Sequence, residues 1–206
     1  MSPPARARRS VFLAAFWDEN PIFRQILGIC SALAATNLLI NTLFMCAGLT
    51  FVTAMSSATV SALRAYTPAR IRMMVQTLII AAYTILVDVA LKAYAPLVSK
   101  ALGPYVGLIL TNCIVMGRCE AFAGQNTVKA SFFDALGSGL GYSLLLVAIA
   151  IPREFLGFGS IAGYGLFGKG WTAWTIMVMP SGAFFMLGLY VWLARSIQHP
   201  PEPKKP

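Results

Sequence analysis

Long apolar runs separated by short polar stretches make up most of the chain, and their lengths suit a lipid bilayer better than a soluble core. We expect six membrane segments, at about 21–36, 37–63, 73–91, 102–117, 132–151 and 171–194. Segments one and four are short, because sixteen helical residues reach only about 24 Å across a hydrocarbon core of about 30 Å. The pattern predicts an all-α integral membrane protein whose segments one and four are half-membrane helices.

The polar stretches predict three parts of unequal size. Residues 1–20 form a basic tail that ends in a short interfacial helix, 21–195 form one membrane domain, and 196–206 form a polar, Pro-rich tail. We expect Pro152, with the charged residues Arg153 and Glu154 behind it, to end segment five. A polar loop is expected between segments four and five, from Arg118 to Lys129.

A short motif, P-x4-I-L-x2-C, occurs twice, at Pro21–Cys30 and at Pro104–Cys113. The two copies open repeats of about 21–92 and 102–194, each with three segments. Three is an odd number, so the second repeat enters the membrane from the opposite face, as an inverted-topology repeat does. Short segments at matching positions of such repeats point to a site near the bilayer midplane. We therefore predict two half-membrane helices meeting head to head, with Cys30 and Cys113 near a pseudo-two-fold axis.

Composition supports the membrane assignment and limits what the charge can mean. The chain is 58% hydrophobic and 11% charged, with a mean hydropathy of +0.72. Its net charge of +9 could suggest nucleic acid, but the basic residues fall between hydrophobic runs, so no nucleic-acid partner is expected. With both termini in the cytoplasm, twelve of the sixteen Lys and Arg residues lie on that side, as the positive-inside rule favours.

The four cysteines carry the candidate chemistry. Cys46 is expected to pack in the core, and Cys119 to be structural, just beyond the half-helix. Cys30 and Cys113 have two interpretations. They are small buried hydrophobes in a chance match, or they form a paired site. A disulfide, a zinc site or an iron–sulfur cluster could use them, but zinc and iron–sulfur centres take four ligands, so a second, similar subunit would have to supply two more.

Two stretches resemble a known family. Asn20–Ala34 and Thr111–Ala123, with the run Ile-Val-Met-Gly-Arg in the second, are similar to signature segments of the D subunits of Na⁺-translocating NADH:quinone reductases (Nqr). That family is related to the E subunits of Rnf ferredoxin:NAD⁺ oxidoreductases. Asp134–Tyr142 and Arg153–Gly157 resemble further family segments, and the likeness covers residues 18–195. The signature runs favour the quinone reductase branch, and Cys119 departs from the alanine usual in the family.

The resemblance implies a subunit of a redox-driven sodium pump in the bacterial inner membrane. It implies that Cys30 and Cys113 ligate the iron of a [2Fe–2S] cluster shared with a homologous subunit of opposite orientation, the E type of a six-subunit complex. NAD, FAD and FMN would lie on other subunits, electrons would pass between flavins, and this chain alone would hold no complete active site. Two alternatives remain open: the equivalent Rnf E subunit, and a cofactor-free secondary transporter built on an inverted repeat.

Acidic residues inside or beside membrane segments are candidates for an ion path, since sodium prefers oxygen ligands. These are Asp88, Asp134 and Glu120. Each has a plainer interpretation: Asp88 pairs with Lys92 at i, i+4, Asp134 is the N-cap or a first-turn residue of segment five, and Glu120 pairs with Arg118 or caps the half-helix.

Overall fold

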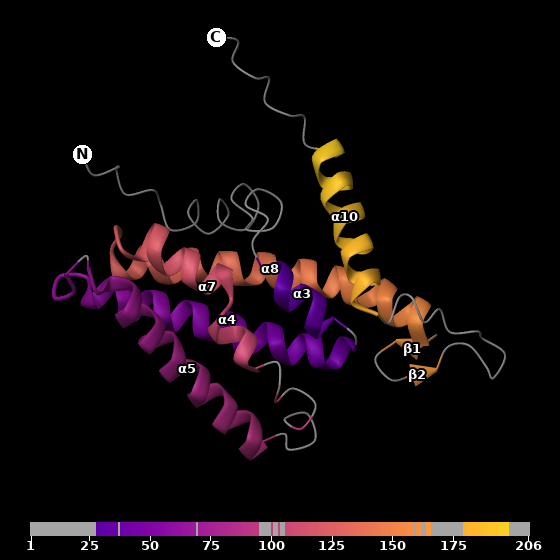
Figure 1. Ribbon diagram of the computed structural model, residues 1–206, viewed down its shortest axis with the longest axis horizontal. Coiled ribbons are helices and arrows are strands. Elements are labelled where there is room, and N and C mark those ends of the chain that lie inside the picture. The colour runs from indigo at the N-terminus through magenta and orange to yellow at the C-terminus, as the bar shows by residue number, and fades with distance from the viewer. Residues whose placement is uncertain are drawn as a thin grey trace, which may run out of the picture.

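The computed structural model describes residues 28–36, 38–68, 70–94, 100, 103, 106–158, 160–161, 164–165 and 179–197. This part of the chain is helical apart from β1 (Ser160–Ile161) and β2 (Tyr164–Gly165), which pair antiparallel. The helices are α3 (Ile29–Ala35), α4 (Leu39–Leu63), α5 (Arg72–Tyr94), α7 (Cys113–Arg118), α8 (Val128–Phe158) and α10 (Pro180–Ile197), with one π-helical turn, η2 (Cys119–Ala123), directly after α7 (Figure 1).

Four helical stretches are long and apolar enough to cross a membrane: Leu39–Leu63, Arg72–Tyr94, Val106–Ala123 and Val128–Gly157. They match predicted segments two to five. Segment one is described only from residue 28 onward, and segment six only from residue 179, where α10 contributes the shorter apolar stretch Ser181–Leu193. The predicted interfacial helix within residues 1–20 and most of the tail from residue 196 lie outside the described residues.

Two predicted boundaries were wrong. Helix α8 does not end at Pro152 but continues to Phe158, with the proline inside it. The residues that follow Pro152 are held by distant partners, which offsets the backbone bond that proline removes. The buried Arg153 guanidinium donates to the Thr36 hydroxyl and to the Met179 carbonyl, and the Glu154 carboxylate accepts from the Leu39 N–H at 2.7 Å.

The expected polar loop 118–129 is also mostly helical. Helix α7 runs directly into η2, which ends only at Ala123, and α8 begins again at Val128. Cys119 and Ala123 of this turn are fully buried, so burial of apolar side chains favours a continued helix over a solvated loop.

The two longest helices, α4 and α8, form the centre of the molecule and run antiparallel (Figure 1). The start of α4 meets the end of α8 through Leu39 and Glu154, and Thr50 in its middle meets Ser143, whose hydroxyl lies 3.3 Å away. A Cβ placed on Gly139 would lie 3.0 Å from the Thr50 Cγ2 and 3.2 Å from its Cα. The missing side chain therefore lets the two backbones approach closely, as small residues do in membrane helix pairs.

We expect Gly139→Ala to destabilise the protein by about 1–3 kcal/mol, because the Thr50 backbone cannot move away from the new methyl group. Gly188→Ala in α10 is the matched control, since nothing lies within 4 Å of a Cβ there. Heating the detergent-purified protein and following the surviving folded peak by size-exclusion chromatography measures both. Equal midpoints for the two variants would contradict the close packing at Gly139.

Helices α5 and α10 pack on the outside of the central α4–α8 pair. Helix α5 packs against α4 and α7, and α10 packs against α8 and α3. In Figure 1 the two helices leave the central pair on opposite sides. Their outward side chains are large and apolar, for example Leu78 and Ile85 on α5 and Phe185 and Trp192 on α10. These surfaces suit lipid or another membrane subunit.

Candidate functional site

The first residues of α3 and α7 meet in the interior, and a single side chain joins them. Asn112 caps α7: its side-chain oxygen accepts from the Ile114 N–H at 3.0 Å. The amide nitrogen of the same side chain donates to the Ser31 hydroxyl at 2.9 Å. Ser31 directly follows Cys30, and Asn112 directly precedes Cys113. The two cysteines of the repeated motif therefore lie next to the two ends of one hydrogen bond.

Gly28 and Tyr142 also take part in this contact between α3 and α7. Gly28 adopts a left-handed conformation with φ of 84°, and a Cβ there would lie 2.6 Å from the Ile114 Cδ1. The fully buried Tyr142 of α8 donates its hydroxyl to the Gly28 carbonyl at 2.7 Å and is hydrogen-bonded to the Ser31 hydroxyl. Helix α8 thus fixes the entry of the chain into α3 against the start of α7. We call Gly28, Ser31, Asn112 and Tyr142 the junction network.

The four cysteines divide into two classes. Cys30 and Cys113 are exposed, whereas Cys46 and Cys119 are buried. The Cys46 thiol lies 3.8 Å from the Ser143 carbonyl, and the Cys119 thiol lies 3.7 Å from the hydroxyls of both Ser56 and Ser57. The packing roles predicted for Cys46 and Cys119 are confirmed.

Both exposed thiols can bind a group that lies outside the described residues. Thiolates of Cys30 and Cys113 could ligate a soft metal centre. In the described residues no group of three or more His, Cys, Asp and Glu side chains lies close enough together to hold a metal ion. A four-ligand centre at these two cysteines would therefore take ligands from beyond the described part of this chain.

Asp134 is buried opposite an arginine. Arg118 ends α7, and its guanidinium lies 3.5 Å from the Asp134 carboxylate, with both side chains less than one-tenth exposed. Because α8 begins at Val128, four residues before the predicted start, Asp134 is its seventh residue and not, as predicted, its N-cap or a first-turn residue. The pair ties the end of α7 to α8.

Glu120 was predicted to pair with Arg118 or to cap the half-helix, and both interpretations were wrong. Its carboxylate accepts from the Gln76 amide at 2.7 Å and lies 3.4 Å from the Arg72 guanidinium, both on α5. The continued helix through η2 turns Glu120 toward α5, while Arg118 faces α8.

Asp88 pairs with Lys92 at 2.6 Å, as its i, i+4 spacing predicted. Each of the three candidate ion-path residues, Asp88, Asp134 and Glu120, therefore has a basic partner. A sodium ion would compete with these partners for the carboxylates. The ion path stays a prediction.

Sequence reasoning missed most of the junction network. A signal for Asn112 existed, since Asn before an apolar helical run is a typical N-cap. Ser31 follows the first motif and had no distinguishing pattern. Tyr142 lies 111 residues from Ser31, and no local pattern links the two.

We expect Asn112→Ala to destabilise the protein by about 2 kcal/mol, because it removes a helix cap and a buried hydrogen bond together. Asn126→Ala is the matched control: among the described residues, its side-chain amide donates only to the Phe122 carbonyl of its own turn, at 3.1 Å. Thermal midpoints of the two purified variants give the comparison. A smaller loss for Asn112→Ala than for Asn126→Ala would argue against the junction.

A family model described as "Rnf-Nqr subunit, membrane protein" matches residues 8–191. The chain belongs to the Rnf-Nqr family. The match extends from before α3 into α10 and so includes both motif cysteines and the junction network. The family resemblance predicted from the sequence is confirmed, and so is a membrane protein with several apolar helices.

Three curated relatives of this Rnf-Nqr chain bear the name of the D subunit of Na⁺-translocating NADH-quinone reductase. The relative from Pseudoalteromonas atlantica is 43% identical over 203 residues, 96% of each chain. One from Pseudomonas aeruginosa is 46% identical over 193 residues, which is 91% of this chain and 86% of the relative. A Shewanella putrefaciens relative is 43% identical over 197 residues, 93% and 94% of the two chains.

Proposed function

We propose that this chain is a membrane subunit of an NADH:quinone reductase that exports Na⁺. In this proposal Cys30 and Cys113 supply two of the four thiolate ligands of a [2Fe–2S] cluster, and a homologous subunit of opposite orientation supplies the other two. The observation that carries the proposal is the Asn112–Ser31 hydrogen bond of 2.9 Å beside two exposed cysteines.

The chemistry of the residues present fits such a group. Iron–sulfur clusters take cysteine thiolates, and this chain offers two at matching positions of a repeated motif. Both are exposed, as ligands shared with a second chain must be, while Cys46 and Cys119 are buried and face serine residues. When bound, the cluster would supply a one-electron carrier within the membrane. The junction network would hold the two thiols at a fixed separation.

The proposal includes six segments in two inverted repeats of 21–92 and 102–194. Reciprocal packing supports it, because the third helix of each proposed repeat contacts the first helix of the other, α5 on α7 and α10 on α3. Two arginines at corresponding places in the two proposed repeats also make corresponding hydrogen bonds. Arg64, just after α4, donates to the Asn126 carbonyl beyond η2, and Arg153 near the end of α8 donates to Thr36 beyond α3.

The remaining parts of the function belong to the assembled complex. NAD, FAD and FMN would lie on other subunits, and electrons would pass between flavins on either side of the membrane, coupled to Na⁺ export. Asp88, Asp134 and Glu120 are the candidates in this chain for contact with sodium. We place the chain in the bacterial inner membrane with both termini in the cytoplasm, which the twelve-to-four distribution of basic residues supports.

Purification through a tag on this chain, followed by reconstitution in liposomes, tests the function. We expect the complex to oxidise NADH with a quinone and to take up ²²Na⁺ only while it does so. Three results would contradict the proposal: sodium uptake by this chain alone without NADH, as a secondary transporter would show; a complex without NADH oxidation; or ferredoxin-dependent NAD⁺ reduction in place of quinone reduction.

A further inference from the structure

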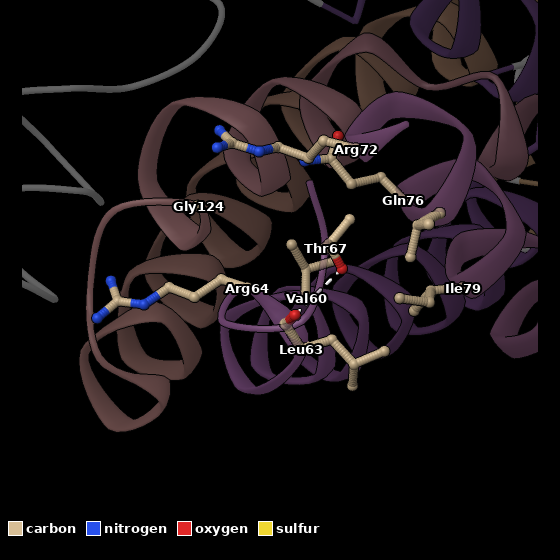
Figure 2. A pocket seen from close by; sticks show the side chains of 9 residues that line it. Val60, Leu63, Arg64, Thr67, Arg72, Gln76, Ile79 and Gly124 are labelled. Carbon is tan, nitrogen blue, oxygen red and sulfur yellow. Dashed lines mark hydrogen bonds between the residues drawn. The ribbon is translucent and has the colours of Figure 1, made fainter. Parts of the chain in front are cut away.

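A pocket between the end of α4, the start of α5 and the turn after η2 has no part in the function proposed above. Its lining combines apolar side chains of α4 and α5 with a polar set: Arg64, Thr67, Arg72, Gln76 and the Gly124 backbone. Figure 2 shows the guanidinium ends of Arg64 and Arg72 directed to the same side of the pocket, with Gly124 between them. Two guanidinium groups on the same side of one pocket, each with its N–H donors in a planar fork, are suited to binding a phosphate group.

The charges around this pocket do not cancel. Arg72 is 3.4 Å from Glu120, and the exposed Arg64 donates to a backbone carbonyl, that of Asn126, at 3.2 Å. The two guanidinium groups of the pocket thus have one carboxylate beside them, that of Glu120 next to Arg72, which leaves one positive charge at the mouth. A ligand with a single negative charge would neutralise it.

A buried acceptor adds a second requirement. Gln76 is 1% exposed and lines the pocket, and its amide nitrogen donates to Glu120 at 2.7 Å. Its carbonyl oxygen Oε1 has no hydrogen-bond partner among the described residues. A buried acceptor left in this state costs about 1–3 kcal/mol, so a ligand that brings a hydroxyl donor would be favoured here.

The surroundings of the pocket indicate where such a ligand comes from. Met73, Met74 and Leu78 on the neighbouring surface of α5 are exposed and apolar, and α5 is long and apolar enough to cross a membrane. A molecule whose phosphate reaches Arg64 and Arg72 would thus have a lipid-facing helix beside it for an acyl chain. Basic pockets at the ends of membrane helices commonly bind anionic lipid head groups.

We propose that this pocket binds the head group of phosphatidylglycerol. The phosphodiester carries the one negative charge and accepts from the guanidinium groups of Arg64 and Arg72 at the mouth, and a small movement of the Gln76 side chain lets a hydroxyl of the terminal glycerol donate to its Oε1. Phosphatidylcholine has neither the net charge nor the hydroxyl donor. The proposal does not depend on the cluster or on the pump.

The test compares two arginine variants of one loop in the complex purified through this chain. Arg64→Gln removes a pocket cation, whereas Arg70→Gln removes an equal charge from an exposed residue that does not line the pocket. Delipidated complex is titrated with phosphatidylglycerol, and the lipid retained after gel filtration is counted by mass spectrometry. We expect about tenfold weaker binding of one lipid in Arg64→Gln and no change in Arg70→Gln.

Three further comparisons separate specific binding of the lipid from other causes of a lower lipid count. Arg64→Lys keeps the charge without the fork, so a smaller loss than in Arg64→Gln is expected, and it replaces that variant if the complex does not assemble. Phosphatidylcholine should bind equally to all forms, and millimolar inorganic phosphate should not displace the retained phosphatidylglycerol. Equal loss in Arg64→Gln and Arg70→Gln, no loss in either, or displacement by phosphate would overturn the proposal.

Discussion

Cys113→Ser is expected to remove about two iron atoms from each purified complex, the content of one [2Fe–2S] cluster. Serine has nearly the size of cysteine, so α7 keeps Asn112 as its N-cap while the thiolate is lost. Quinone reduction should fall by on the order of 100-fold or more, since even changes behind a metal ligand cost about 10–100-fold. Cys30→Ser should give the same result, because each cysteine supplies one ligand of the same group.

Cys119→Ala is the matched control for this experiment. It lies six residues beyond Cys113 in the same helical stretch, but its thiol is buried against Ser56 and Ser57. We expect unchanged iron content. Iron and acid-labile sulfide are quantified in complexes that elute at the same volume. Full iron in Cys113→Ser, or equal loss in Cys119→Ala, would argue against a cluster at Cys113.

Asp134→Ala is expected to give the largest loss of stability, about 3–5 kcal/mol, because it removes the carboxylate that faces the buried Arg118 guanidinium. The charge of Arg118 is retained while α7 loses its tie to α8. Heating followed by size-exclusion chromatography of the detergent-purified protein should show a midpoint far below that of the parent. A midpoint within a degree or two of the parent would contradict a structural role for this pair.

Two further variants separate burial from charge. Asp88→Ala removes an exposed pair with Lys92 and should cost at most about 1 kcal/mol. The double variant Arg118→Met with Asp134→Leu removes both buried charges and should recover most of the loss, since an apolar pair can replace a buried ion pair at little cost. Failure of the double variant to recover would assign the effect to packing around Asp134.

Much of the helix pattern follows from the sequence because membrane helices are long apolar runs with charged ends. Leu39–Leu63 and Arg72–Tyr94 lie within a few residues of their predicted bounds for that reason. Pro152 misled the prediction of the end of α8. A proline ends a helix when nothing else holds the next turn, and here partners far along the chain hold Arg153 and Glu154.

For the site too, the sequence predicts the features that a local motif carries and misses those that depend on distant contacts. The repeated motif places Cys30 and Cys113 at matching positions, and the structure adds the bond between their neighbours. The Asp88–Lys92 pair could be predicted because both residues lie on one helix, but partners on other helices could not, because successive helical residues point about 100° apart. Arg118 and Glu120 therefore face α8 and α5, although they lie only two residues apart.

In the function proposed here, Cys30 and Cys113 hold iron together with a second chain. Anomalous diffraction from crystals of the whole complex, recorded at the iron absorption edge, tests it most directly. We expect an iron peak within bonding distance of both Sγ atoms and of two cysteine Sγ atoms from a homologous subunit. An electron-density map with both thiols ordered and no iron peak beside them, or with all four ligands of the nearest cluster on other chains, would contradict it.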